Sequence, residues 1–212
     1  YSARRLTSSG FSDSTRGVNV GGFDGSNRKT NIDKMTFAST GSSASFGTLA
    51  TARSSQAGFS NSTRGFACGG IVDPGVFNAD IIYFTIQSDG NGVDFGADIT
   101  EARDSAGAGA NSTRGLVVGG YNNTPSPVTN KKEIDYVTIA TLGTVQDFGD
   151  LTETRRGSGV VTSPIRAVFA GGYTPSASDT MDYVTFATLG NATNFGNCTK
   201  VGGNFAGASD TV

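Results

Sequence analysis

The residues that most invite a chemical role are arginines that return at nearly constant intervals. The sequence Ser-Thr-Arg-Gly occurs three times, a degenerate fourth copy follows, and the arginines are Arg16, Arg64, Arg114 and Arg166. Four guanidinium groups in a ring could bind an anion. Alternatively, each arginine lies at the corner of a repeated unit and pairs with a neighbouring carboxylate or with backbone carbonyls. We favour this structural role, because one ligand rarely needs an identical group from every repeat.

Acidic residues recur as well. Asp33, Asp135 and Asp182 hold one position of a repeated apolar segment, and Asp80 or Asp94 is the nearest substitute in the second copy. Acid–base catalysis would need two carboxylates that converge in different environments, and the sequence shows no such pair. Pairing with arginine is therefore the favoured role. The same structural role is expected for the arginines at the junctions between repeats, Arg53, Arg103 and Arg155.

Three other motifs have structural explanations. Residues 89–94 superficially resemble a calcium loop but lack its closing glutamate, so a glycine-rich turn is expected. Cys68 and Cys198 are too few for a disulfide scaffold, and a buried free thiol is expected for each. Asn61 and Asn111 occupy the repeated turn, so turn geometry explains their sequons. The full set of N-x-Ser/Thr sequons begins at Asn61, Asn111, Asn122, Asn191 and Asn197.

The composition excludes several classes of function. The chain has no histidine, which removes Ser-His-Asp and Cys-His catalysis and nearly all zinc sites. Its 16 basic and 18 acidic residues leave a net charge of −2, which disfavours nucleic acid as a partner. No stretch approaches the ~18 apolar residues of a membrane span, so no membrane insertion is expected. We expect no catalytic residue, no metal and no cofactor.

The chain is built from four copies of one unit. The repeated arginines are 48, 50 and 52 residues apart, and a glycine pair follows each arginine after five residues. A Tyr-Val-Thr-Ile-like segment comes next, and ten residues beyond its threonine stands Phe-Gly, at Phe46, Phe95, Phe148 and Phe195. Only the gap between the glycine pair and the threonine varies appreciably, from 13 to 18 residues. One connection in each repeat is therefore free to change length.

Each unit is expected to form four short strands. A small-residue segment, an apolar run that ends at the glycines, the Tyr-Val-Thr-Ile segment and the Phe-Gly segment follow in that order. Helical periodicity is absent, so the fold class is all-β. The expected units are residues 4–53, 54–103, 104–155 and 156–202, with an extra first strand at 203–212.

This order of features resembles the kelch repeat. Tyr83, Tyr136 and Tyr183 fall where kelch carries its tyrosine, and the four Phe-Gly phenylalanines fall where kelch usually carries tryptophan. The resemblance covers essentially the whole chain and implies a β-propeller, or a propeller segment, of four-stranded antiparallel blades. It implies nothing about chemistry. Residues 135–143 and 147–152 also resemble long repeat proteins of tailed phages of marine bacteria, which are taken to be virion structural or appendage proteins.

The extra strand at residues 203–212 makes seventeen strands, one more than a four-bladed ring needs. Either the chain is a window from a longer array, or one terminal strand pairs with a neighbouring chain. We therefore expect other protein chains as partners, including copies of this one.

The variable connections form the candidate contact surface. In an antiparallel meander, successive turns alternate between two ends, so the connections after the glycine pairs must share one end. Exposed aromatic side chains can stack on a partner, and the asparagine and aspartate side chains beside them can form hydrogen bonds with it. An equally weighted alternative is that these aromatics plug the ring. The candidate contact residues are Phe23, Asp24, Pro74, Phe77, Tyr121, Asn122, Asn123 and Tyr173.

Three functions were weighed on this basis. The leading expectation is a non-catalytic structural or adhesion component of an extracellular assembly, such as a tailed-phage virion appendage. The alternative is a carbohydrate-binding propeller whose partner is a surface glycan. An enzyme of the kelch-like copper oxidase type is disfavoured, because that chemistry requires imidazole ligands.

Overall fold

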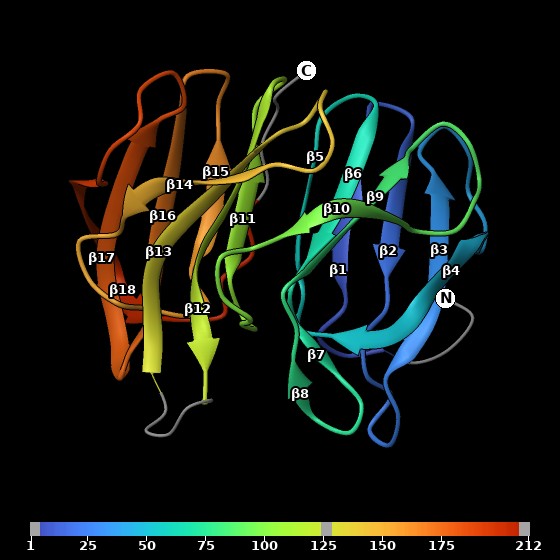
Figure 1. Ribbon diagram of the computed structural model, residues 1–212, viewed down its shortest axis with the longest axis horizontal. Coiled ribbons are helices and arrows are strands. Elements are labelled where there is room, and N and C mark those ends of the chain that lie inside the picture. The colour runs from blue at the N-terminus through green and yellow to red at the C-terminus, as the bar shows by residue number, and fades with distance from the viewer. Residues whose placement is uncertain (1–4, 124–128, 208–212) are drawn as a thin grey trace.

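The protein is all-β, as the sequence predicts. The computed structural model describes residues 5–123 and 129–207, and within these ranges the regular structure consists of strands without a helix. Eighteen strands form four antiparallel sheets (Figure 1).

Each repeat supplies one four-stranded meander. Sheet 1 contains β1 (Ser9–Ser12), β2 (Arg16–Val20), β3 (Lys29–Thr36) and β4 (Ala44–Ser54). Sheet 2 contains β5 (Ala57–Ser60), β6 (Arg64–Cys68), β9 (Asp80–Thr85) and β10 (Val93–Asp98). Sheet 3 contains β11 (Gly107–Ala110), β12 (Arg114–Asn122), β13 (Thr129–Thr138) and β14 (Val145–Asp150). Sheet 4 contains β15 (Gly159–Thr162), β16 (Arg166–Thr174), β17 (Ser176–Thr185) and β18 (Thr193–Gly202).

A short hairpin in the second repeat breaks this regularity. Its strands β7 (Ile71–Val72) and β8 (Val76–Phe77) lie in the variable connection, and β7 pairs with the end of β4. Sheet 1 therefore has six strands, two of them supplied by the second repeat. The hairpin ties the two repeats together through backbone hydrogen bonds.

The glycine pairs stand where the backbone turns back and meets the next junction. Gly21 and Gly22 have φ angles of 57° and 108°, in the region that favours glycine. The N–H of Gly22 donates to the carbonyl of Arg53 over 2.8 Å, and a Cβ on Gly21 would lie 2.6 Å from the same oxygen. The pair is thus a requirement for close packing between consecutive repeats.

The Phe-Gly segments form β-bulges. In sheet 3, Ile134 pairs with Gly149 and Asp135 pairs with Asp147, so Phe148 lies unpaired between them. The bulge turns the phenylalanine ring into the space between two sheets, where it is buried. Phe46 and Phe195 hold the same bulge position in sheets 1 and 4.

The apolar core lies between the sheets. Three clusters of buried side chains fill the spaces between sheets 1 and 2, sheets 2 and 3, and sheets 3 and 4. The consecutive residues from Gly115 to Gly120 of β12 are all buried, so both faces of this second strand are covered.

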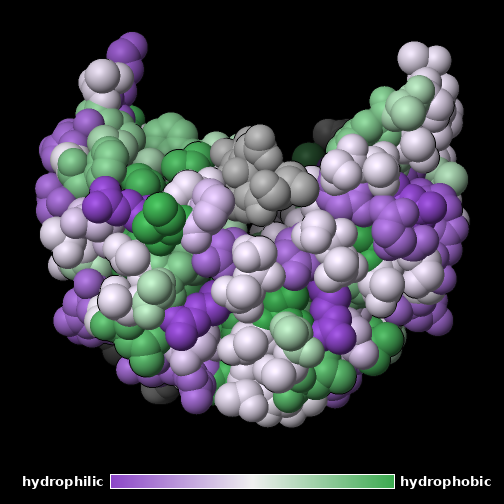
Figure 2. Space-filling model, turned by 90° about the horizontal axis from the view of Figure 1, so that it is seen from above, coloured by the Kyte–Doolittle hydropathy of each residue, from purple (hydrophilic) through white to green (hydrophobic). Residues whose placement is uncertain are grey.

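The sheets stand side by side in an open crescent. Figure 2 shows a molecule hollowed on one side, with an opening between two arms. The first strands β1, β5, β11 and β15 line this concave side. The turns between first and second strands and those between third and fourth strands lie at one end, here named the turn end (Figure 1). The variable connections lie at the opposite loop end, as predicted.

Residues 203–207, where the extra first strand is predicted to begin, follow β18 without regular strand structure. The N–H of Asn204 donates to the carbonyl of Gly157, just as Ser105 donates to Ser55 and Ser55 to Thr7. Asn204 also shares the left-handed backbone conformation of the residues before the other sheets. The φ angles of Thr7, Ser55, Ser105 and Asn204 all lie between 50° and 57°. Asn204 therefore holds the same place before sheet 4's outer face as Ser55 and Ser105 hold before sheets 2 and 3, and residues 208–212 of the predicted strand lie outside the described residues.

Candidate functional site

The junction arginines form buried ion pairs, which confirms their structural role. Nη2 of Arg103 lies 2.7 Å from Oδ2 of Asp135, and the two side chains are 0% and 2% exposed. Arg155 pairs in the same way with Asp182, and Arg5 with Asp33. Each arginine precedes a sheet in the chain and pairs with the third strand of that sheet.

In the second repeat, the ion pair of the junction arginine forms with a different acidic residue. Ile82 stands where the other repeats have aspartate, and Asp80, two residues earlier, takes its place. Nη2 of Arg53 lies 3.1 Å from Oδ2 of Asp80, which is 44% exposed. Of the two substitutes that the sequence suggests, Asp80 is the one that the structure selects.

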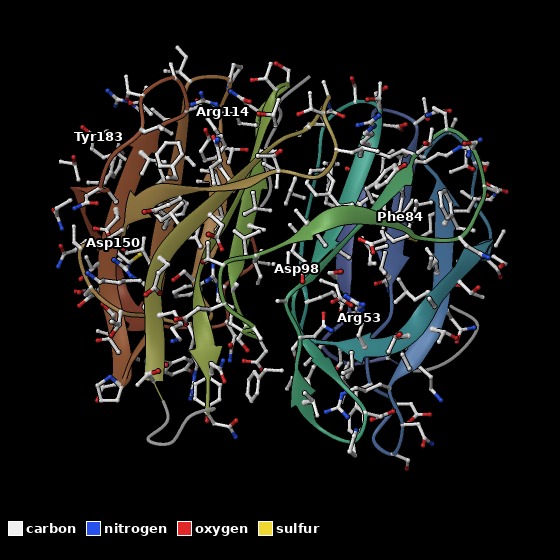
Figure 3. All side chains as sticks on the ribbon, viewed as in Figure 1. Arg53, Phe84, Asp98, Arg114, Asp150 and Tyr183 are labelled. Carbon is white, nitrogen blue, oxygen red and sulfur yellow. The ribbon has the colours of Figure 1, made fainter. Side chains whose placement is uncertain are left out.

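The arginines of the Ser-Thr-Arg-Gly turns join one sheet to the next. Nη1 of Arg64 donates to the carbonyl of Ile139 over 2.6 Å, Arg16 donates to Ile86 over 3.4 Å, and Arg114 donates to Phe186. This confirms the predicted pairing with backbone carbonyls. Figure 3 shows Arg114 near the turn end and Arg53 in the half nearer the loop end, so the two arginine series lie at opposite ends of the sheets.

The side chains in these turns are also engaged. Oδ1 of Asn61 accepts hydrogen bonds from the N–H groups of Thr63 and Arg64, and its amide donates to the carbonyl of Ser112 in the next repeat. Asn111 makes the same set, and its amide donates to Pro164. Turn geometry therefore accounts for these two sequons.

The calcium-like segment at residues 89–94 is a turn that fastens two sheets. The Asp89 carboxylate pairs with Arg16 and Lys34 of sheet 1, and Oδ1 of Asn91 accepts from the N–H of Thr48. Within the described residues, no three His, Cys, Asp or Glu side chains gather as metal ligands.

The loop end brings three of the candidate contact residues together. The rings of Phe77 and Tyr121 lie 5.8 Å apart, and the guanidinium of Arg156 lies 4.5 Å from the centre of Tyr121 and 6.0 Å from that of Tyr173. We name these four residues the aromatic row. It crosses from the second repeat to the fourth, and its members are half-buried.

The remaining candidate residues lie apart from the row. Phe23 stacks with Arg28, and Asp24 pairs with Lys29. The Lys29 ammonium, with the N–H groups of Asn27 and Ser26, holds the pKa of Asp24 well below its usual range. The other three candidates are Pro74, which is exposed in the β7–β8 turn, Asn123, which is exposed, and Asn122, which is buried and donates to the carbonyl of Ala102.

Sequence reasoning missed Arg156 and Asp104. Each directly follows a junction arginine and lies opposite the residue after a glycine pair, in the bridges Arg156–Tyr173 and Asp104–Tyr121. Burial raises the pKa of Asp104 to about 6, while Ser105 and Arg156 act in the lowering direction. An alignment of the four repeats would show that Asp104 and Arg156 each come directly after a junction arginine. That shared position was the signal that could have placed both residues beside the aromatic row.

The two thiols differ in burial. Cys68 is buried on β6, as predicted, and loss of solvation raises the pKa of its thiol. Cys198 is only half-buried, which corrects the expectation of two buried thiols. It lies on the outermost strand of sheet 4, beyond which no further sheet is described.

The concave side offers space but little chemistry. The first strands line a hollow of about 730 Å³ with small residues such as Ser60 and Ala110.

The described residues contain no helix long and apolar enough to cross a membrane. No protein-family model matches this chain, and no curated protein matches it. The described geometry offers stacking and hydrogen bonding at the loop end and contacts between sheets elsewhere.

Proposed function

We propose that this chain is a kelch-like propeller segment that serves as a non-catalytic structural component of an extracellular assembly, such as the virion appendage of a tailed phage. The observation that carries the proposal is that the recurring charged residues of the chain form contacts within and between its own sheets. Arg5 and the three junction arginines bind carboxylates of the third strands, and three of the four turn arginines bind carbonyls of the next sheet. A chain whose repeated charges serve packing in nearly every repeat suits a building element better than an enzyme.

Particle association tests this function. Antibodies raised against the chain should label intact virions at regular positions in immunoelectron microscopy of lysates from cells that carry the gene. Label that stays with the soluble fraction, away from particles, would contradict a virion role.

The aromatic row supports a second candidate, a carbohydrate-binding function at the loop end. Half-exposed rings beside a guanidinium can stack on a sugar and donate hydrogen bonds to its hydroxyls. A glycan array screened with the wild type and with the Tyr121→Ala/Tyr173→Ala variant tests it. Glycan binding that is lost at an unchanged melting temperature favours a contact role. A large fall in melting temperature instead favours the plug interpretation.

Tyr183→Ala provides the matched control. Tyr183 stacks under Arg166 near the turn end (Figure 3), away from the proposed sugar contact. Its substitution should leave any glycan binding unchanged.

A further inference from the structure

The same contact between sheets occurs three times inside the chain. Its first element is the turn arginine, which donates to a carbonyl of the following sheet. Its second element runs the other way, because the N–H of a glycine in the following sheet donates to the carbonyl of the bulge phenylalanine. These glycine–phenylalanine pairs are Gly90–Phe46, Gly143–Phe95 and Gly190–Phe148, with N···O distances of 2.8 to 2.9 Å.

Sheet 4 presents one half of this contact without its counterpart. Phe195 is 52% exposed, whereas the equivalent Phe46, Phe95 and Phe148 are 4%, 1% and 2% exposed. Arg166 stacks on Tyr183 but has no carbonyl acceptor among the described residues, unlike the other three turn arginines.

Sheet 1 presents the other half. Phe37 is 58% exposed, whereas the equivalent Ile86, Ile139 and Phe186 are 0%, 1% and 2% exposed. The carbonyls of these three buried residues are the acceptors of the turn arginines. Gly41 holds the position of Gly90, whose N–H meets a bulge carbonyl.

We propose that a second copy of this chain seats its sheet 1 on sheet 4. Arg166 of one copy donates to the Phe37 carbonyl of the other, and the Gly41 N–H of the second copy donates to the Phe195 carbonyl of the first. This contact between copies does not depend on the function proposed above. It repeats the contacts between the chain's own sheets, so the same argument applies to any assembly that contains the chain.

Two copies satisfy both exposed faces at once. Propellers typically have 4–8 blades, and the four sheets of one chain leave an open crescent (Figure 2). Two chains would supply eight sheets, with a two-fold axis that makes both contacts between copies identical. This count rests on the propeller fold proposed above, whereas the contact itself rests only on the sheets.

Residues 203–207 occupy the innermost place on the exposed face of sheet 4. They hold the position that β1 of the second copy would take, as the Asn204–Gly157 hydrogen bond shows. The tail and the incoming β1 therefore compete for one place, and one of them must move aside. The outer contacts through Arg166 and Phe195 are the same in either case.

Light scattering coupled to size exclusion tests the proposal on the full chain over a wide range of concentration. The wild type should reach twice the mass of one chain, whereas Phe195→Asp and Phe37→Asp should each stay at the mass of one chain. An equimolar mixture of the two variants should regain twice that mass, because one chain keeps an intact sheet 4 and the other an intact sheet 1. Leu142→Asp is the control, since Leu142 is 48% exposed in the turn between β13 and β14 and lies outside the exposed end faces.

The circular dichroism spectrum must be unchanged in both variants, which is expected because each ring is more than half exposed. A wild type that stays at single mass at every concentration would overturn the proposal. So would a dimer that both variants leave intact, or a mixture that fails to associate. Polymers longer than two chains would overturn the closed ring.

Discussion

The buried junction pair of sheet 3 allows a quantitative test of how the repeats are held together. Arg103→Met removes the guanidinium and leaves the Asp135 carboxylate, 2% exposed, with only the N–H and hydroxyl of Thr100 as described hydrogen-bond donors. Breaking a buried pair in this way costs about 3–5 kcal/mol. A protein of this kind is stable by about 5–15 kcal/mol, so the loss should be plain.

Arg53→Met is the matched comparison. It removes the equivalent guanidinium, but its partner Asp80 is 44% exposed and water can solvate the carboxylate that remains. We expect a loss of about 1–2 kcal/mol, from the weaker ion pair and the lost packing of the arginine stem.

Urea unfolding measures both losses. With a slope of about 2 kcal/mol/M, Arg103→Met should lower the midpoint by about 1.5–2.5 M and Arg53→Met by about 0.5–1 M. Arg103→Met/Asp135→Leu should recover much of the loss, because it removes both buried charges. Equal midpoints for the two single variants, or a double variant no better than Arg103→Met, would refute the reasoning.

Three further predictions follow from burial. The unfolded chain loses the Asp104 proton near pH 4 and the folded chain near pH 6, so wild-type stability should fall as the pH rises between these values. Thermal melts of Asp104→Asn should lack this fall and show a gain of about 1 kcal/mol at pH 7, after allowance for partial exposure. Ellman's reagent should modify Cys198 in the folded protein and reach Cys68 only after denaturation, and two equally fast thiols would contradict the burial of Cys68. Gly115→Ala should cost about 1–3 kcal/mol, because its Cβ would lie 1.9 Å from the Phe59 ring, and Phe59→Leu should restore part of the loss.

Sequence periodicity was sufficient for the local structure. Constant spacing means that insertions are not tolerated, and it located the strands and assigned the variable connections to one end. Alternation of turns in a meander is a geometrical necessity, so this assignment needed no tertiary information. The substitute for the in-register aspartate of the second repeat was narrowed only to Asp80 or Asp94, and the structure selects Asp80, which the Arg53 stem reaches two residues along the strand.

Contacts that cross from one repeat to another were not readable. The β7–β8 hairpin joins sheet 1 because its edge meets the end of β4, which depends on how two sheets are oriented. The aromatic row likewise depends on Arg156 reaching two neighbouring connections. The open crescent depends on the small rotation from each sheet to the next, and no single-residue pattern records that rotation.

The packing at one position shows what the proposed contact between copies must accommodate. The Phe11 ring fills the space that Gly65 leaves empty, and Phe59 does the same at Gly115. At Gly17 the ring of Phe37 from the same sheet takes this place and would lie 3.2 Å from a Cβ there. Sheet 4 offers Val161 at the position of Phe59, a smaller side chain that is 43% exposed. For a second copy to pack against Gly17, the Phe37 ring must swing outward, and that movement would bring the ring to the place where Ile86 is buried in the first internal interface.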